Sequence, residues 1–329
     1  MSTTENLKPL KTWSHLSNKR RKPSEYEIVT ANLHFNNREE NAPYQVDSTM
    51  FMNEWYKKNT FGSKLQHDDW NSFRDPDEVV YRTYTMMQDG QETYVYGLFD
   101  QFSNKEHDKS LDANWVGSLA LRFSPARYLF HTVQLQSAYI AQTAPASTIT
   151  VCGIFQMADS FRWLTHTAYR TKELSLTYPD KGFTTNEQGF WENEPIWQGF
   201  RELTEKSLTA WDWAESFVSL NLVVKPAIEE TVLRKLGESA RHNNDQLLAM
   251  LCDAQLIDAM RHRRWATSLV QMALEGKETN KQVIQEWITK WEPLADKAID
   301  AYCSGLPDVP NATEDAKEAV RAYRKSLGF

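Results

Sequence analysis

Two short stretches, about a hundred residues apart, carry acidic, basic and aromatic side chains at the same spacing. They are residues 159–163 (DSFRW) and 258–262 (DAMRH), each with the form Asp-x-x-Arg followed by an aromatic residue or His. A carboxylate and a His three positions apart on one helix face can bind a transition metal. Those positions hold Ser160 with Trp163, and Ala259 with His262. Three of these four side chains are poor or impossible metal ligands, so the spacing of a metal site is present without its donors.

The corresponding motif in ferritin-like di-iron carboxylate proteins is Asp-Glu-x-Arg-His, carried by two helices of one bundle. We therefore expect a bundle derived from an oxygen-activating fold whose metal site is degenerate. The acidic and basic residues persist in both stretches, as Asp159 with Arg162 and Asp258 with Arg261. They are candidates for a structural ion-pair network, formed either within each helix at i, i+3 or crosswise between the two helices.

The rest of the chain supplies helices to position these stretches, and it contains no convincing strand series. Asp75-Pro76 with Glu78 predicts a helix start, and Ser124-Pro125 predicts a second. Further helices are expected at 147–178, at 198–224 with a stop near Pro226, at 227–242, from a cap at Asp245 to 276, at 280–304 and at 313–326. The predicted fold is all-α and ferritin-like (ribonucleotide-reductase-like), with extra helices around the bundle.

Residues 1–75 differ from the remainder, because they combine a basic run with isolated aromatic residues and show no clear period. Disordered tails lack aromatic residues, so an extended N-terminal arm that lies on a partner is the hypothesis for 1–75, and 76–329 is the helical domain. The interface candidates are Trp13, Tyr26, Trp55 and Trp70. The alternative for the basic run is a solvated surface. For the 12 tryptophans, including Trp115, core and interface roles stay equally open.

Composition excludes several classes of protein. The net charge of −7 argues against a nucleic-acid partner for the body of the protein. The three cysteines are widely spaced and predict reduced thiols in a cytoplasmic protein. No run approaches 18 apolar residues and the chain does not begin with an apolar leader, so neither a membrane span nor a signal peptide is expected.

Other catalytic patterns are absent from the sequence. It contains no phosphate-binding loop, no dinucleotide fingerprint, no His-Glu-x-x-His and no nucleophile elbow. Glu238 and His242 are four positions apart in a polar stretch, where a surface pair is the simpler interpretation. His262 alone is more often a hydrogen-bonded core residue than a ligand. Glu215 could be a lone inward carboxylate, which by itself cannot hold two irons.

Ten stretches spread along the chain resemble one known family. They are residues 10–16, 21–26, 75–84, 88–92, 125–131, 144–149, 162–171, 221–226, 261–265 and 290–296. Together they resemble the β subunit of the hydroxylase component of bacterial multicomponent (soluble di-iron) monooxygenases, in the toluene and alkene/isoprene branch. The likeness runs nearly from end to end, and the departures at Ser160, Trp163 and Ala259 are those a subunit without metal should have.

This resemblance implies a dimer of αβγ protomers, in which an α subunit carries the di-iron centre and the hydrocarbon pocket. This chain would hold no cofactor and would scaffold the dimer together with α, γ and a second β subunit. A coupling protein, a Rieske-type ferredoxin and a reductase would serve the complex, which inserts one oxygen atom of O2 into an aromatic hydrocarbon or alkene with electrons from NADH.

Two other hypotheses remain. The chain could be an active di-iron oxidase or oxygenase in its own right, with residual metal held by His262 and Glu215. It could also be a helical binding protein unrelated to oxygenases. Metal analysis of the chain with and without its partners distinguishes them. The sequence does not name the hydrocarbon, because the pocket is expected on another subunit.

Overall fold

The computed structural model describes residues 22–33 and 47–329, and within these ranges the regular structure is helical, with no strand. The all-α prediction is confirmed. Trp13 lies outside the described residues. No helix in the described ranges is long and apolar enough to cross a membrane.

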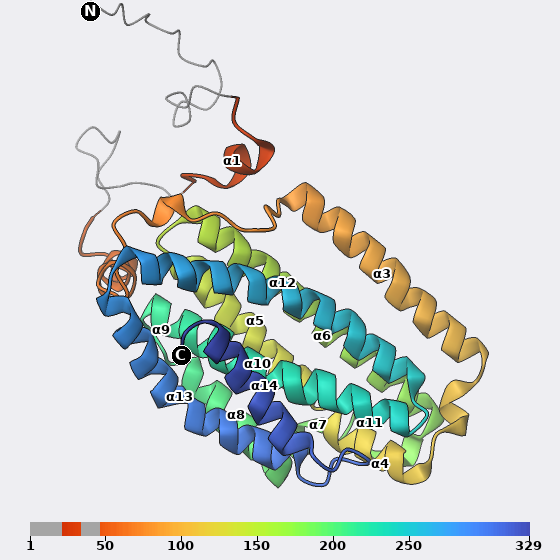
Figure 1. Cartoon of the computed structure of the whole chain (residues 1–329). Coiled ribbons are helices and arrows are strands. Elements are labelled where there is room, and N and C mark those ends of the chain that lie inside the picture. Colours follow the sequence, from red (N-terminus) through yellow and green to blue (C-terminus); the bar gives the residue numbers. More distant parts are fainter. Residues whose placement is uncertain (1–21, 34–46) are drawn as a thin grey trace, which may run out of the picture.

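Two pairs of long helices form the centre of the fold. The first pair is α5 (Ala126–Thr143) and α6 (Ser147–Thr177), joined by a short turn. The second pair is the helix that runs from Trp213 to His242 and α12 (Gln246–Gly276). Helix α6 packs against both α5 and α12, and in Figure 1 α3 (Tyr81–Asn104) runs along one edge of these helices with α13 (Thr279–Cys303) on the opposite side. Helix α12 packs against both α6 and α3, so the two stretches with the Asp-x-x-Arg pattern face each other.

Shorter helices cover the ends and one side of this bundle. They are α4 (Ala113–Arg122), α7 (Glu187–Asn193), α8 (Pro195–Ser207) and α14 (Ala312–Ser326). The helices predicted at 147–178, after the Asp245 cap, and at 280–304 and 313–326 are present within a residue or two. The side chain of Asp245 accepts a hydrogen bond from the backbone N–H of Leu248 at 3.1 Å, as an N-cap does.

The predicted helix start at Asp75-Pro76 is wrong by about five residues. The carboxylate of Asp75 accepts hydrogen bonds from the backbone N–H groups of Asp77 and Val79, both at 3.1 Å. These bonds close a turn instead of capping a helix, and Glu78 lies in the left-handed region with φ 45°. Helix α3 begins only at Tyr81.

The helix predicted at 198–224 is wrong in two respects, because it is interrupted between Ser207 and Trp213 and because the helix that begins at Trp213 does not stop near Pro226. The helix continues through α9 (Trp213–Val218), a π-helical turn η6 (Ser219–Val224), α10 (Lys225–Ile228), a second π-helical turn η7 (Glu229–Lys235) and α11 (Leu236–His242). A proline inside an α-helix clashes with the carbonyl four residues before it. The wider π-helical turn that precedes Pro226 changes that spacing, so the helix does not end there.

The described part of residues 1–75 lies on the helical body of this chain. It forms α1 (Glu25–Thr30), α2 (Phe51–Tyr56) and two short turns, η2 (Lys57–Phe61) and η3 (Trp70–Ser72). Ser147 donates a hydrogen bond to the Thr30 carbonyl at 2.6 Å, and Thr60 donates to the Thr143 carbonyl at 2.8 Å. Contact of the arm with a partner chain stays a prediction.

Most tryptophans of the described ranges belong to the core. Trp115, Trp163, Trp197 and Trp213 are at most 1% exposed, and Trp211, at 47%, is the single exposed tryptophan there. The interface interpretation of Trp115 is therefore wrong. Cys152, Cys252 and Cys303 are buried and unpaired.

Candidate functional site

The two Asp-x-x-Arg stretches meet between α6 and α12, and each aspartate pairs with the fifth residue of the other stretch. His262 Nε2 lies 2.7 Å from Asp159 Oδ2. Trp163 Nε1 donates a hydrogen bond to Asp258 Oδ2 at 3.1 Å. The four side chains thus form two links that cross from one helix to the other.

The arginines follow the same crosswise pattern. Arg162 Nη1 is 2.9 Å from Asp258 Oδ2 but 3.5 Å from Asp159 Oδ1 on its own helix. Arg261 Nη2 contacts Asp159 Oδ2 directly, whereas it is 3.5 Å from Asp258 Oδ1 on its own helix. Of the two arrangements that the sequence leaves open, the shorter pairs are those between the helices.

Helix α3 closes this cluster with neutral donors. Tyr84 donates its hydroxyl hydrogen to Asp159 Oδ1 at 2.9 Å. The Gln88 amide donates to Asp159 Oδ1 at 2.8 Å and to Asp258 Oδ1 at 3.0 Å. Both aspartates are almost fully buried, at 0% and 3% exposure, so every added donor offsets part of their desolvation cost.

A lysine extends the cluster from the Trp213–His242 helix. Lys225 Nζ lies 3.1 Å from His262 Nδ1 and 2.9 Å from Glu229 Oε1, and it stands 5.2 Å from the centre of the Trp163 ring. Glu229 Oε2 accepts a further bond from Arg263 Nε at 2.6 Å. Lys225 is 3% exposed. An ammonium group has only donors, so His262 Nδ1 accepts and Nε2–H donates to Asp159.

The charges of the cluster set its protonation states. Burial, with the nearby Lys225 and Arg261 cations, lowers the pKa of His262 well below its usual value, so the imidazole is neutral. Burial opposes the charged form of Glu229, but Lys225 and Arg263 outweigh it and lower the pKa of Glu229 to about 2. Burial raises the pKa of Asp159, and Arg261 opposes this shift.

These residues do not fit a di-iron centre. Both nitrogens of His262 are engaged, and the motif carboxylates are paired with guanidinium groups. Ser160 donates its hydroxyl to the Gln156 carbonyl of its own helix at 2.9 Å, and Ala259 has no donor. No group of three or more His, Cys, Asp or Glu side chains within 22–33 and 47–329 is arranged to hold a metal.

The other sequence candidates lie elsewhere. Glu215 accepts from Lys290 Nζ at 2.6 Å and Trp291 Nε1 at 3.1 Å, so it does not share a site with His262. Tyr26 is 5% exposed and accepts from the Asp75 backbone N–H at 2.9 Å. Trp55 and Trp70 are half-buried against Trp211 and Trp213, with ring centres 5.3 and 5.1 Å apart. A role at an interface stays a prediction for them.

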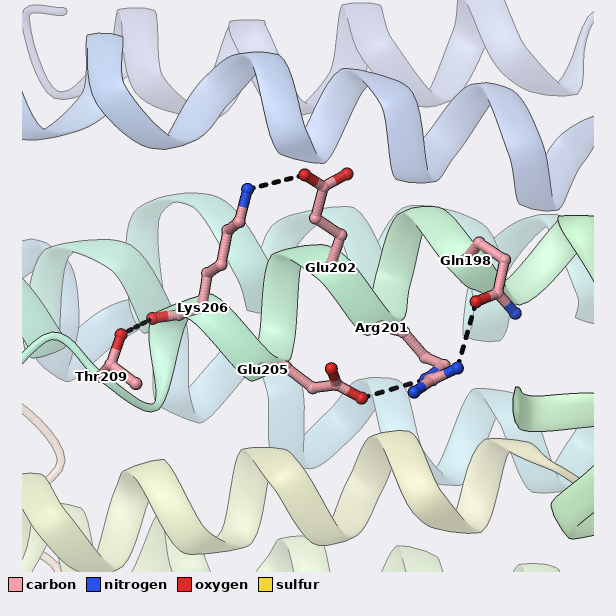
Figure 2. A pocket seen from close by; sticks show the side chains of 6 residues that line it. All are labelled: Gln198, Arg201, Glu202, Glu205, Lys206 and Thr209. Carbon is pink, nitrogen blue, oxygen red and sulfur yellow. Dashed lines mark hydrogen bonds and ion pairs between the residues drawn. The ribbon is translucent and has the colours of Figure 1, made fainter. Parts of the chain in front are cut away.

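A surface hollow on α8 is another place where charged side chains gather (Figure 2). Arg201 Nε pairs with Glu205 at 3.0 Å, and Lys206 pairs with Glu202 at 2.7 Å, each within one helical turn. Glu202 also accepts from Lys297 of α13 at 2.5 Å. The hollow is a solvated row of ion pairs along one helix, which makes it a surface feature and not a site.

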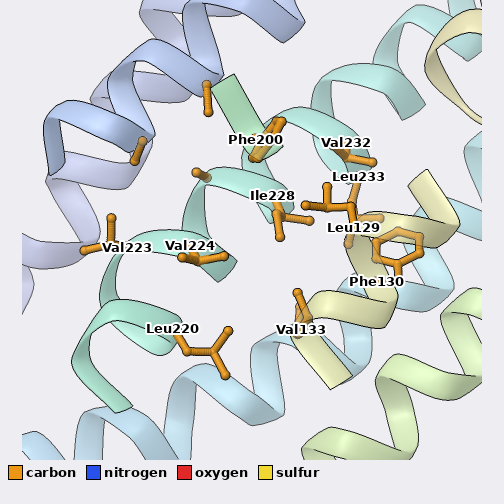
Figure 3. Close-up of a cluster of buried hydrophobic side chains, with 14 of the residues drawn as sticks. Leu129, Phe130, Val133, Phe200, Leu220, Val223, Val224, Ile228, Val232 and Leu233 are labelled. Carbon is orange, nitrogen blue, oxygen red and sulfur yellow. The ribbon is translucent and has the colours of Figure 1, made fainter. Parts of the chain in front are cut away.

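The sequence interpretation missed Tyr84, Gln88, Lys225 and Glu229. A signal for the last two was present, because they interrupt an otherwise apolar run. Figure 3 shows that run, including Val223, Val224, Ile228 and Val232, within a cluster of buried hydrophobic side chains. A lysine and a glutamate four positions apart in such a run indicate a buried ion pair. No comparable signal marks Tyr84 and Gln88, which are brought to the cluster by tertiary packing of α3.

Comparison with known proteins identifies the family. The model of the methane/phenol/alkene hydroxylase family matches residues 43–277. The chain belongs to that family. It is 56% identical, over 92% of both chains, to the β subunit of the hydroxylase component of the toluene-4-monooxygenase system of Ectopseudomonas mendocina. An oxygenase component of phenol 2-monooxygenase from Pseudomonas sp. (strain CF600) is 25% identical over 80% of this chain and 79% of its own length.

Solved structures of this hydroxylase family have the same fold. Toluene 4-monooxygenase with toluene bound in the resting active site matches with a TM-score of 0.87 at 55% identity, over 92% of this chain and 99% of the matched chain. Phenol hydroxylase from Pseudomonas sp. OX1 matches in fold with a TM-score of 0.81 at 18% identity, over 100% of this chain and 98% of the other. The resemblance to the hydroxylase β subunits and the ferritin-like fold prediction are both confirmed.

Proposed function

We propose that this chain is a non-catalytic β subunit of a multicomponent monooxygenase hydroxylase, which scaffolds a di-iron α subunit and an (αβγ)2 dimer. The observation that carries the proposal is the replacement of a metal site by an ion-pair cluster between α6 and α12. The helices and the crosswise aspartates remain, but the donor positions hold Ser160, Trp163 and Ala259. Such a chain retains the shape of an oxygen-activating subunit without its chemistry.

The proposed complex oxidises aromatic hydrocarbons or alkenes. The similarity to a subunit of the toluene-4-monooxygenase system supports an aromatic substrate. Its partners would be the α and γ subunits, a second β subunit, a coupling protein, a Rieske-type ferredoxin and an NADH-dependent reductase. Because NADH is a cytoplasmic reductant, we also propose a cytoplasmic location. No cofactor is assigned to this chain, and the di-iron centre is assigned to α.

Exposed apolar side chains support obligate association. Large ones stand out on α3, α6 and α12, among them Tyr81 (76% exposed), Met86 (65%), Leu176 (72%), Ile257 (55%) and Met260 (59%). Isolated apolar side chains are ordinary on a protein surface. Several large exposed ones on three neighbouring helices are typical of a chain that functions within a complex.

The proposal is tested by metal analysis of separated subunits. The chain is co-expressed with its α and γ neighbours, the complex is purified, and iron is measured in the complex and in each subunit after native dissociation. We expect iron to follow α, and turnover to require both chains. We also expect this chain alone to self-associate or to be poorly soluble. Iron in stoichiometric amount in this chain would support the alternative of an active di-iron oxidase, and a well-behaved lone monomer would contradict the scaffold role.

A further inference from the structure

Lys225 stands where three parts of the degenerate site meet. Its ammonium group contacts a carboxylate of its own helix, Glu229 Oε1 at 2.9 Å, and an imidazole of α12, His262 Nδ1 at 3.1 Å. It also faces the ring of Trp163 on α6, with 5.2 Å between Nζ and the ring centre. A carboxylate oxygen and an imidazole nitrogen thus point at one buried cation. The same two kinds of donor atom bind divalent metals such as Zn²⁺ in metalloproteins.

The charges of the cluster balance because of this lysine. Three almost fully buried carboxylates belong to it, those of Asp159, Asp258 and Glu229. Three cations contact them, those of Arg162, Arg261 and Lys225. On the outer side, Glu92 pairs with Arg162 at 2.6 Å, Arg263 pairs with Glu229 at 2.6 Å and with Glu230 at 2.8 Å, and Arg234 pairs with Glu230 at 2.8 Å, which adds two charges of each sign. Without Lys225, one negative charge of the buried cluster lacks its counterpart.

We propose that Lys225 takes the place and the charge of a metal ion, so that loss of its ammonium group turns Glu229 and His262 Nδ1 into part of a divalent-cation site. This inference rests on the proposed function, because it presupposes that the wild-type chain holds no metal. Metal bonds to these donors measure roughly 2.0–2.2 Å, so the carboxylate oxygen would have to close in by about 0.8 Å and the imidazole nitrogen by about 1 Å. Glu229 can do so while its other oxygen remains with Arg263.

The charge half of the proposal is that Lys225 supplies the positive charge of a metal ion. It is tested with Lys225→Met, in the full chain purified with its partner subunits. Met is unbranched and only one atom shorter than Lys, so it keeps most of the side chain and removes the charge. The matched control is Lys206→Met, because Lys206 also pairs with a glutamate four positions away, Glu202 at 2.7 Å, but its side chain is 57% exposed. We expect Lys225→Met to lower the melting temperature by roughly 6 °C or more and the control to lower it by about 2 °C or less. Equal shifts in the two variants would overturn the proposal.

A second substitution tests the same balance in another way. Adding Glu229→Gln to Lys225→Met removes the carboxylate that lost its partner, and Arg263 keeps Glu230, 2.8 Å away. The double variant should melt above Lys225→Met. If it melts lower by the sum of the two single effects, the lysine is an ordinary core residue.

The metal half of the proposal is that Glu229 and His262 bind a divalent cation once the ammonium group is lost. It is tested with Lys225→Glu, which adds a third donor beside these two residues. We expect addition of Zn²⁺ or Co²⁺ to raise the melting temperature of this variant, with visible Co²⁺ absorption and about one more metal per chain than in wild type. Adding His262→Gln should abolish the response. The metal half is overturned if wild type takes up the same extra metal, if His262→Gln leaves the response intact, or if Lys225→Glu folds and does not respond. Iron in untreated wild-type chain would instead defeat the proposed function. If Lys225→Glu does not fold, the metal half is tested on Lys225→Met, whose melting temperature should rise on addition of Zn²⁺, and the absence of any rise overturns this half.

Discussion

Asp159 Oδ2 lies 2.7 Å from His262 Nε2, although the two residues are 103 positions apart and belong to different helices. In a working metal site, a carboxylate at this place orients the imidazole ligand. In this chain the other nitrogen of the ring faces the ammonium group of Lys225. The bond therefore holds α6 to α12, and its loss should affect stability and not iron chemistry.

The variant His262→Ala tests this directly. We expect it to leave the iron content and the turnover per iron of the assembled hydroxylase unchanged. It should lower the free energy of unfolding by roughly 2–4 kcal/mol, because it opens a cavity and removes two buried hydrogen bonds. Iron per complex and turnover per iron are measured together with thermal unfolding. Loss of iron on this substitution would show that the chain carries a metal site.

Arg261→Ala should be more damaging than a similar change one turn further along α12. The Arg261 side chain is 8% exposed and pairs with Asp159, so its loss leaves a carboxylate short of its partner at a cost of roughly 3–5 kcal/mol. The control is Arg264→Ala, because Arg264 pairs with Asp77 at 2.8 Å but its side chain is 50% exposed, which predicts about 1 kcal/mol or less. Denaturant unfolding and the yield of complex measure the difference. Similar losses for the two variants would refute the prediction.

Stability should fall as the solution is acidified below pH 6.5. Burial lowers the pKa of His262 in the folded protein below its usual 6.5, so the unfolded chain takes up a proton there that the folded chain does not. Burial also lowers the pKa of His166, which adds to the same loss of stability on acidification. The lowered pKa of Glu229, about 2 against 4.5, adds stability that is lost between pH 4.5 and 2. The raised pKa of Asp159 opposes this loss.

The check is the slope of melting temperature against pH between 7 and 5.5. His262→Gln removes the titrating ring and should flatten the slope, whereas His131→Gln, which changes an exposed histidine on α5, should leave it as in wild type. Identical slopes for wild type and His262→Gln would contradict the assignment of a neutral buried imidazole.

Glycine substitutions test the packing that supports the bundle. A Cβ added at Gly199 would lie 2.5 Å from Ala298 Cα, so Gly199→Ala should push α8 away from α13 and cost roughly 1–3 kcal/mol. Gly189 on α7 has nothing within 4 Å of such an atom, and Gly189→Ala should be neutral or stabilising by up to about 1 kcal/mol. Chemical denaturation of the two variants in parallel distinguishes them, and a stable Gly199→Ala variant would show that the helices can separate freely.

The sequence predicted the helices and the retained motif residues because those depend on local patterns. Apolar spacing and the Asp245 cap locate α12 to within a residue. The prediction of helix ends failed where a residue type is compatible with two local structures. Asp75 closes a turn instead of starting a helix, and a π-helical turn before Pro226 allows the helix to continue past it. Both outcomes depend on neighbouring backbone geometry that residue identities do not specify.

The site was predicted in part for a similar reason. The pairing of Asp159, Arg162, Asp258 and Arg261 followed from their repetition, but its crosswise direction depends on how α6 and α12 pack. Gln88 bonds to both aspartates from α3, at 2.8 and 3.0 Å, and only the tertiary fold brings it there. Glu215 was a candidate for a lone inward carboxylate, but it accepts hydrogen bonds from Lys290 and Trp291 of α13.

The balance of three buried carboxylates by three cations also limits which substitutions the bundle can accept. A di-iron site in this cluster would require new carboxylates at positions such as Ser160 and Ala259, both at most 1% exposed. The first such substitution would place an uncompensated negative charge in the bundle before any metal could neutralise it. Each single step towards such a site should therefore cost stability, so that a di-iron site could be gained only by several changes made together.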